Sequence, residues 1–206
     1  MNAHALQDML AGFDDEALGS QAAFRVALQA LAHPGRVTAM PIEAECPPTG
    51  HPAAAVLLLA LLDADCTLWL SPTLVGSPTA AWLRFHTGCR LVADAAEATF
   101  AWVAQGDVLP ALASFAQGSD ADPEDSTTLV IDLPSLDGGE PLALGGPGIA
   151  TTHTLQPLGL PDDFTAQWAA NHAAFPRGVD VFLAAPGAIA GLPRTTRIAV
   201  PAPLEA

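Results

Sequence analysis

Apolar residues recur at helical spacing in the first part of the chain. Phe24, Leu28 and Leu31 lie three or four residues apart, which is the spacing of one helix face. Ser20 precedes them and is a residue type that caps helix N-termini. The pattern therefore predicts a first helix from about Ser20 to His33, which the proline that follows would end.

Helices and strands alternate along the rest of the chain. Capping residues and apolar runs predict further helices at 52–62, 77–88, 109–117 and 162–174. Runs of β-branched and apolar residues predict strands at 36–40, 67–71, 91–93, 99–103, 127–133, 141–144, 151–155 and 179–184, with a hairpin-like tail over 188–200. The strand at 179–184 is almost wholly apolar, which is typical of a strand covered on both faces. This order predicts an α/β fold, a three-layer αβα sandwich with a mixed sheet.

The chain is expected to form one domain. It has 206 residues, half of them apolar, and a domain of this size buries roughly 70% of the surface that its unfolded chain exposes. No internal repeat and no change of composition marks a linker. We therefore predict a single domain over 1–206, with a flexible N-terminus over 1–18 and an exposed acidic loop over 118–125.

Charge and hydropathy argue against two classes of partner. The net charge is −15, which repels nucleic acid and anionic membrane surfaces. The most apolar stretch, 53–62, has ten residues, whereas a membrane-spanning helix needs about 20. No secretory signal is recognisable, and three widely spaced cysteines fit a reducing compartment. We therefore predict a cytoplasmic protein without nucleic-acid or membrane partners.

All seven basic residues are arginines, so the chain has no lysine. Pyridoxal-phosphate (PLP) enzymes hold their cofactor on a lysine, and a P-loop also needs one. The missing amine excludes both. The histidines show no HxH or HExxH spacing and the cysteines no CxxC, so we expect neither a metal site nor a cofactor.

A glycine-rich segment, 144–149, follows a predicted strand. Such turns can hold a phosphate with their backbone N–H groups. However, Pro147 has no N–H, no convincing helix follows, and the spacing departs from GxGxxG. A structural turn is therefore favoured over a nucleotide-binding loop.

Several arginines stand where they can bind an anion or a partner protein. The alternatives are helix capping and structural ion pairs. The candidate ligand or partner contacts are Arg25, Arg84, His86, Arg90, Asp180 and Arg194. Cys89, beside Arg90, is either a thiol of lowered pKa or a buried cysteine, and burial fits better. No catalytic residue is assigned.

Several short motifs together form a more specific pattern. They are Phe24-Arg25 with His33-Pro34-Gly35, Leu-Trp-Leu-Ser at 68–71, Leu-Arg-Phe-His-Thr at 83–87, Phe-Pro-Arg-Gly-Val-Asp at 175–180 and Leu-Pro-Arg-Thr-Thr at 192–196. Their order and spacing cover residues 24–196. On this set the chain resembles the H subunit of the bacterial carbon–phosphorus lyase, the PhnH family of phosphonate metabolism proteins.

The resemblance implies a fold like the large domain of PLP-dependent transferases, without PLP. It implies an accessory subunit of a transferase and lyase complex, which forms homodimers alone and joins the G, I and J subunits in the core complex. With the I, G and L proteins it would support synthesis of α-D-ribose 1-methylphosphonate 5-triphosphate from ATP and a phosphonate, so that the cell can use alkylphosphonates. Two alternatives stay open: a subunit that itself binds a phosphate or phosphonate through an arginine cluster, and a plain dimeric scaffold.

Overall fold

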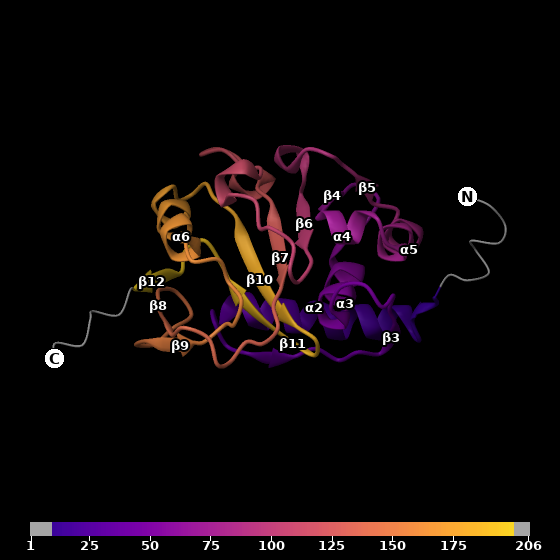
Figure 1. The fold of residues 1–206 in the computed structure, drawn as a ribbon, viewed down its shortest axis with the longest axis horizontal. Coiled ribbons are helices and arrows are strands. Elements are labelled where there is room, and N and C mark those ends of the chain that lie inside the picture. Colours follow the sequence, from indigo (N-terminus) through magenta and orange to yellow (C-terminus); the bar gives the residue numbers. More distant parts are fainter. Residues whose placement is uncertain (1–9, 200–206) are drawn as a thin grey trace.

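A seven-stranded mixed sheet forms the centre of the molecule (Figure 1), in a computed structural model that describes residues 10–199. The strands, in their order across the sheet, are β2 (Thr38–Ala39), β11 (Ala188–Leu192), β10 (Asp180–Ala185), β7 (Thr128–Asp132), β6 (Phe100–Val103), β4 (Thr67–Leu70) and β5 (Arg90–Leu91). The five strands from β10 to β5 are parallel, whereas β11 runs antiparallel to both of its neighbours. The predicted α/β class with a mixed sheet is confirmed.

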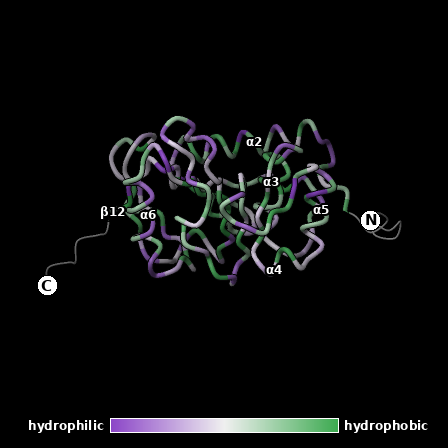
Figure 2. The backbone as a smooth tube through the Cα atoms, turned by 90° about the horizontal axis from the view of Figure 1, so that it is seen from above, coloured by the Kyte–Doolittle hydropathy of each residue, from purple (hydrophilic) through white to green (hydrophobic). Residues whose placement is uncertain are grey.

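Successive residues of the central strands enter two different cores. In β10, Phe182 and Ala184 belong to one core, and Val181 and Leu183 to the other, because side chains alternate between the two faces of a strand. The first core lies under helices α2 (Glu16–Ala32), α3 (Pro52–Leu61), α4 (Pro72–Val75) and α5 (Pro78–Thr87). The second lies under α6 (Phe164–Ala173) and a small sheet. In Figure 2 many of the hydrophobic segments lie toward the middle of the molecule, between these layers.

The small sheet is separate from the central one. Its strands, in the order β12-β8-β9, are β12 (Arg197–Ala199), β8 (Leu142–Gly145) and β9 (His153–Leu155), and all pairs are antiparallel. The predicted hairpin-like tail is therefore divided, since β11 pairs with β10 while β12 joins β8. A further short pair, β1 (Gly12–Phe13) and β3 (Ala44–Glu45), holds the start of the described chain.

Helix α2 begins earlier than the apolar spacing predicts. Its N-cap is Asp15, whose side chain accepts a hydrogen bond from the Leu18 N–H, at 3.0 Å. The prediction that Ser20 caps this helix is therefore wrong. Its fully buried residues are all small, Gly19, Ala23, Ala27 and Ala30, with Val26 and Leu31 partly buried beside them. The large residues Phe24 and Leu28 lie on its outer side, where 45% and 51% of each is exposed.

One predicted helix is wrong. Residues 109–117 contain only a 3-10 turn, η2 (Leu112–Ser114). After this turn the backbone is not helical, because Gln117 forms an antiparallel β-bridge with Ser126. In addition, the Ala116 carbonyl accepts the N–H of Thr127, at 2.9 Å. The Gln117 side chain then bonds the carbonyls of the turn. The acidic loop that follows is exposed except for the half-buried Gly118 and Pro123, and it holds a second 3-10 turn, η3 (Pro123–Asp125).

The predicted flexible N-terminus, 1–18, falls partly outside the described residues. Residues 1–9 cannot be compared, whereas β1 and the start of α2 lie within 10–18. In the part of the chain from 10 to 199, no helix has the length and apolar character needed to cross a bilayer.

Candidate functional site

Arg194 and Asp180 form a bonded cluster with neighbouring loops. The Arg194 guanidinium donates to both Asp180 oxygens, from Nη2 at 2.7 Å and from Nε at 3.2 Å. Its Nη1 reaches the carbonyls of Pro123 and Pro176, and Nη2 also meets the Ser126 hydroxyl. All five N–H donors of the guanidinium therefore have protein acceptors. This is the geometry of a structural ion pair, which leaves no donor for a ligand.

His86 anchors the beginning of the described chain. Its Nε2 lies 2.9 Å from the Leu10 carbonyl, which also accepts the Trp82 indole N–H, at 3.2 Å. The imidazole packs edge-on against Trp82 and Phe85. Of the predicted contacts, His86 is thus placed where it secures the chain before α2.

Arg84 and Arg90 lie close together, at the end of α5 and in β5. Both are exposed and line a hollow of about 750 Å³ with Phe85 and Cys89. Neither has a carboxylate partner among residues 10–199. Arg25 is exposed on a different element, α2. The predicted arginines therefore occupy three separate places, and only Arg84 and Arg90 share a hollow.

Cys89 is a buried cysteine rather than an activated thiol. Its side chain is buried under the end of α5. Burial raises the pKa of Cys89, and this outweighs the lowering by the Thr87 hydroxyl and by the Arg84 charge. The structure thus agrees with the packing interpretation.

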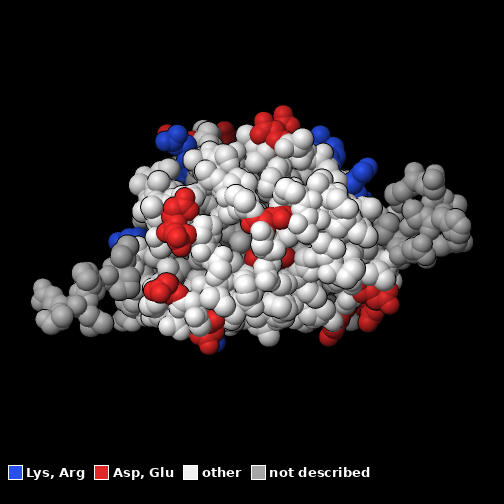
Figure 3. Space-filling model, in the orientation of Figure 1, with Lys and Arg blue, Asp and Glu red and all other residues white. Residues whose placement is uncertain are grey.

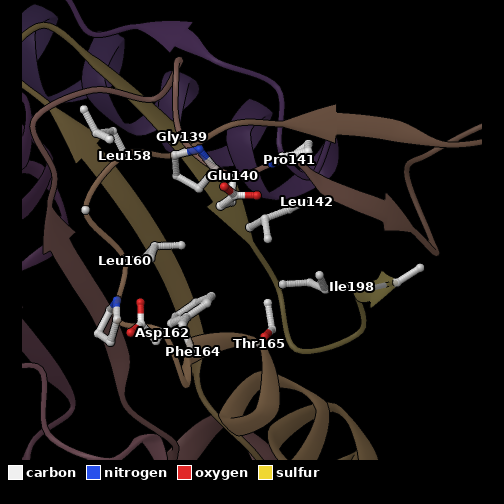
Figure 4. Close-up of a pocket in the computed structure, with 14 residues that line it drawn as sticks. Gly139, Glu140, Pro141, Leu142, Leu158, Leu160, Asp162, Phe164, Thr165 and Ile198 are labelled. Carbon is white, nitrogen blue, oxygen red and sulfur yellow. The ribbon is translucent and has the colours of Figure 1, made fainter. Parts of the chain in front are cut away.

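An apolar hollow of about 400 Å³ lies between the small sheet and α6 (Figure 4). Leu142, Phe164 and Ile198 extend toward it from β8, α6 and β12. Its charged lining residues are both acidic, Glu140 and Asp162. This hollow therefore suits an apolar group and disfavours an anion.

Two adjoining hollows, unlike this one, are lined by an arginine. One, of about 320 Å³, is lined by His33–Pro34 and by 148–153, and the other, of about 810 Å³, by residues after β7 and at the ends of β10 and β11. Arg36 and His153 line both. The glycine-rich segment considered in the sequence analysis thus ends in the wall of a basic hollow. Sequence reasoning missed this site, because its two halves lie more than 100 residues apart in the chain.

A buried carboxylate ends β7. Asp132 accepts the Trp102 indole N–H and the His51 backbone N–H, both at 2.9 Å. Burial raises the pKa of Asp132 to about 6, against the lowering effect of these hydrogen bonds and of His51. The sequence does not predict that Asp132 is buried, because an aspartate at the end of an apolar strand is usually exposed. It ties the loop before α3 to the sheet.

The charged surface and the metal-ligating side chains complete the survey of the described chain. Among residues 10–199 no three His, Cys, Asp or Glu side chains gather in an arrangement that would hold a metal ion. On the face in Figure 3 acidic side chains form scattered patches, while basic ones lie near the outline. Fold and surfaces together define an α/β domain with hollows and an outward apolar helix face.

Comparison with known proteins places this domain in a family. The model of the bacterial phosphonate metabolism protein family, PhnH, matches residues 11–199. The chain belongs to this family. It is 39% identical to the "Alpha-D-ribose 1-methylphosphonate 5-triphosphate synthase subunit PhnH" of Rhizobium meliloti (strain 1021), over 90% of this chain and 93% of that protein. It is 31% identical to the "Putative C-P lyase subunit protein HtxG" of Stutzerimonas stutzeri, over 86% of this chain and 85% of that protein. The family resemblance inferred from the short motifs is confirmed.

Proposed function

We propose that this chain is an accessory, non-catalytic subunit of a carbon–phosphorus lyase complex. In that role it supports synthesis of α-D-ribose 1-methylphosphonate 5-triphosphate and the use of alkylphosphonates. The observation that carries the proposal is the near full-length similarity to the Rhizobium meliloti protein, which is named as a subunit of that synthase. The second relative, named as a C-P lyase subunit, points the same way.

The outer face of α2 supports a role in an assembly. Phe24 and Leu28 lie four residues apart, so they share one side of the helix, and both are about half exposed. The small residues of α2 have taken the buried side instead. Large apolar side chains on an outer face are favourable when another protein covers them. We propose that a neighbouring subunit of the complex covers this face, which we call the α2 face.

The remaining expectations concern partners and place. We propose that the G, I and J subunits are the partners, that the isolated protein forms a homodimer, and that it works in the cytoplasm without nucleic acid. A likeness of the fold to the large domain of PLP-dependent transferases belongs with this proposal. It is supported by the parallel strands β10 to β5 with layers on both faces.

Co-expression with the other subunits tests the proposal. A tagged chain is expected to co-purify G, I and J, and the variant Phe24→Glu/Leu28→Glu to lose them. Val108→Glu is the matched control, because Val108 is 86% exposed and lies away from α2 in the chain. Normal growth on methylphosphonate after deletion of this gene would contradict the accessory role.

The alternative is a subunit that binds phosphate or phosphonate through arginines. The favouring observation is the hollow that Arg84 and Arg90 share. Removing one phosphate-contacting arginine costs about 1.5–3 kcal/mol of binding free energy. Calorimetry of the wild type, Arg84→Gln and Arg90→Gln with ATP and methylphosphonate measures this, and absent binding at millimolar ligand ends this alternative.

A further inference from the structure

We propose that the paired hollows around Arg36 form a binding site for a small organic phosphate or phosphonate, with the anionic group in the smaller hollow. The site consists of His33, Arg36, residues 148–153 and residues 135–137. It is distinct from the hollow between Arg84 and Arg90. It does not depend on the proposed membership in a complex.

Close packing of two glycines shapes the paired hollows, with Gly148 in the lining of the smaller one and Gly35 in the lining of the larger one. Gly148 lies against the end of α2, where an added Cβ would stand 2.3 Å from the Ala32 carbonyl oxygen. Gly35 lies against β8 and β9, where a Cβ would come within 2.1 Å of Leu144. Both have positive φ angles, of 82° and 77°, a backbone conformation that residues with a Cβ rarely adopt. These contacts hold the glycine-rich loop beside Arg36.

The donors of the hollow are not consumed by the protein. Arg36 is exposed and has no carboxylate partner among the described residues. The backbone N–H groups of loop residues 148 and 150–152 donate to none of the backbone carbonyls that accept hydrogen bonds in the turns and loops of the described chain. His153 is fixed by its Nε2, which lies 3.0 Å from the Gly35 carbonyl. A guanidinium and free backbone N–H groups are the donors that bind phosphate oxygens.

The larger hollow has room for the part of the ligand that carries no charge. About 810 Å³ lies within the roughly 300–1,000 Å³ of small-molecule sites. Its lining combines Val37, Leu136 and Ala188 with the polar groups of Ser135, Asp137 and Gln156. It lies beside the ends of β7 and β10, the edge at which open α/β sheets bind ligands. Polar groups beside apolar walls suit a hydroxylated body, so the geometry favours a sugar phosphate.

The residues that line the other hollows make them less suitable for this ligand. The hollow in Figure 4 carries only acidic charges, at Glu140 and Asp162. The hollow at Arg84 and Arg90 has the charges but no glycine-rich loop. Around Arg36, the one carboxylate of the lining, Asp137, belongs to the larger hollow alone. A further hollow, of about 550 Å³, also combines an arginine, Arg197, with loop residues Thr151 and Thr152, but its lining holds no residue that follows β7 or ends β10. Among these hollows, the pair around Arg36 joins a cation and the loop to the ligand-binding edge of the sheet.

Calorimetric titration of the purified full chain tests the site. The probes are ribose 5-phosphate, inorganic phosphate, methylphosphonate and, without an anion, ribose. We expect saturable binding of ribose 5-phosphate, weaker binding of phosphate and methylphosphonate, and none of ribose. Arg36→Gln should weaken ribose 5-phosphate binding at least tenfold. Arg177→Gln is the matched control, because it removes the same charge from an exposed pair with Asp120.

Amide NMR spectra of the same titration locate the ligand. The resonances of 148–152 should shift in the wild type and not in Arg36→Gln, while circular dichroism confirms that this exposed substitution leaves the fold intact. Equal weakening by Arg36→Gln and Arg177→Gln, or shifts at 84–91 instead, would overturn the proposal. So would the lack of saturable ribose 5-phosphate binding at about 10 mM ligand, tenfold above a Kd of 1 mM, which corresponds to about −4 kcal/mol. None of these outcomes bears on co-purification with G, I and J, so the two proposals fail separately.

Discussion

Arg194 joins four segments of the chain through one side chain. Its partners belong to the acidic loop, to the turn before β10, and to β10 itself, and its own backbone N–H also donates to Asp180, at 2.7 Å. The pair is largely enclosed, with 12% of the Arg194 side chain and 24% of the Asp180 side chain exposed. Removal of the Arg194 guanidinium leaves the Asp180 charge and the carbonyls of Pro123 and Pro176 without their donors.

The substitution Arg194→Gln should therefore destabilise the fold by about 3 kcal/mol, as breaking a buried ion pair does. Arg177→Gln removes an arginine whose pair with Asp120 is exposed, at 53% and 80%, and should cost about 0–1 kcal/mol. Urea unfolding of both variants measures the difference. Similar losses in the two would contradict the structural role assigned to Arg194.

Asp132 should make stability depend on pH. Its pKa in the fold is raised from 3.8 to about 6, so between these values the folded chain binds a proton that the unfolded chain does not. Stability from this group is thus full below about pH 4 and is lost as pH rises through about 6, by about 3 kcal/mol for two pKa units. Urea unfolding from pH 4 to 7 measures it against Asp132→Asn, which carries no titrating group. An identical pH slope in the two proteins would refute the assignment.

Helix α2 packs on the sheet with the side that carries its small residues. An added Cβ at Gly191 of β11 would stand 2.6 Å from the Ala30 backbone, so helix and sheet approach closely. Overpacking such a contact costs about 1–3 kcal/mol. Ala30→Leu should therefore lower the free energy of unfolding by this amount, whereas Leu28→Ala on the α2 face should change it by about 0.5 kcal/mol or less. Thermal unfolding distinguishes them, and a large loss in Leu28→Ala would place that side chain in the core.

Local chemistry predicted most elements and the α/β class with a mixed sheet, but not which side of the first helix is buried. The helix over 77–88 has its capping serine at Ser77 and its left-handed glycine at Gly88, as expected. By contrast, apolar spacing on α2 pointed to Phe24, Leu28 and Leu31, of which only Leu31 packs, partly buried, against the core, while alanines take the buried positions. Periodicity shows that a helix has an apolar side, but tertiary packing decides which side is buried.

The candidate site was predictable only in pieces. The ion pair of Asp180 and Arg194 was among the open alternatives, and the glycine-rich segment was singled out. Nothing local joins Arg36 to residues 148–153, because the contact between Gly148 and Ala32 depends on the whole fold. Such long-range proximity needs the structure.

At the scale of the whole molecule, α2 connects two surfaces of different character. Its outer side presents Phe24 and Leu28, and its C-terminal end at His33 lines the smaller hollow. A net charge of −15 works against anion binding over most of the surface. An anion site on this chain therefore requires a local arrangement, and the loop beside Arg36 provides it.

Because these surfaces use different side chains, their functions should separate by mutation. Phe24→Glu/Leu28→Glu should lose co-purification with G, I and J and still bind ribose 5-phosphate as the wild type does. Arg36→Gln should co-purify normally and bind the sugar phosphate at least tenfold more weakly, since it removes the guanidinium and leaves the α2 face intact. Pull-down and calorimetry on the same preparations measure both properties. If either variant lost both while its circular dichroism stayed native, the helix would couple the two surfaces instead of merely carrying them.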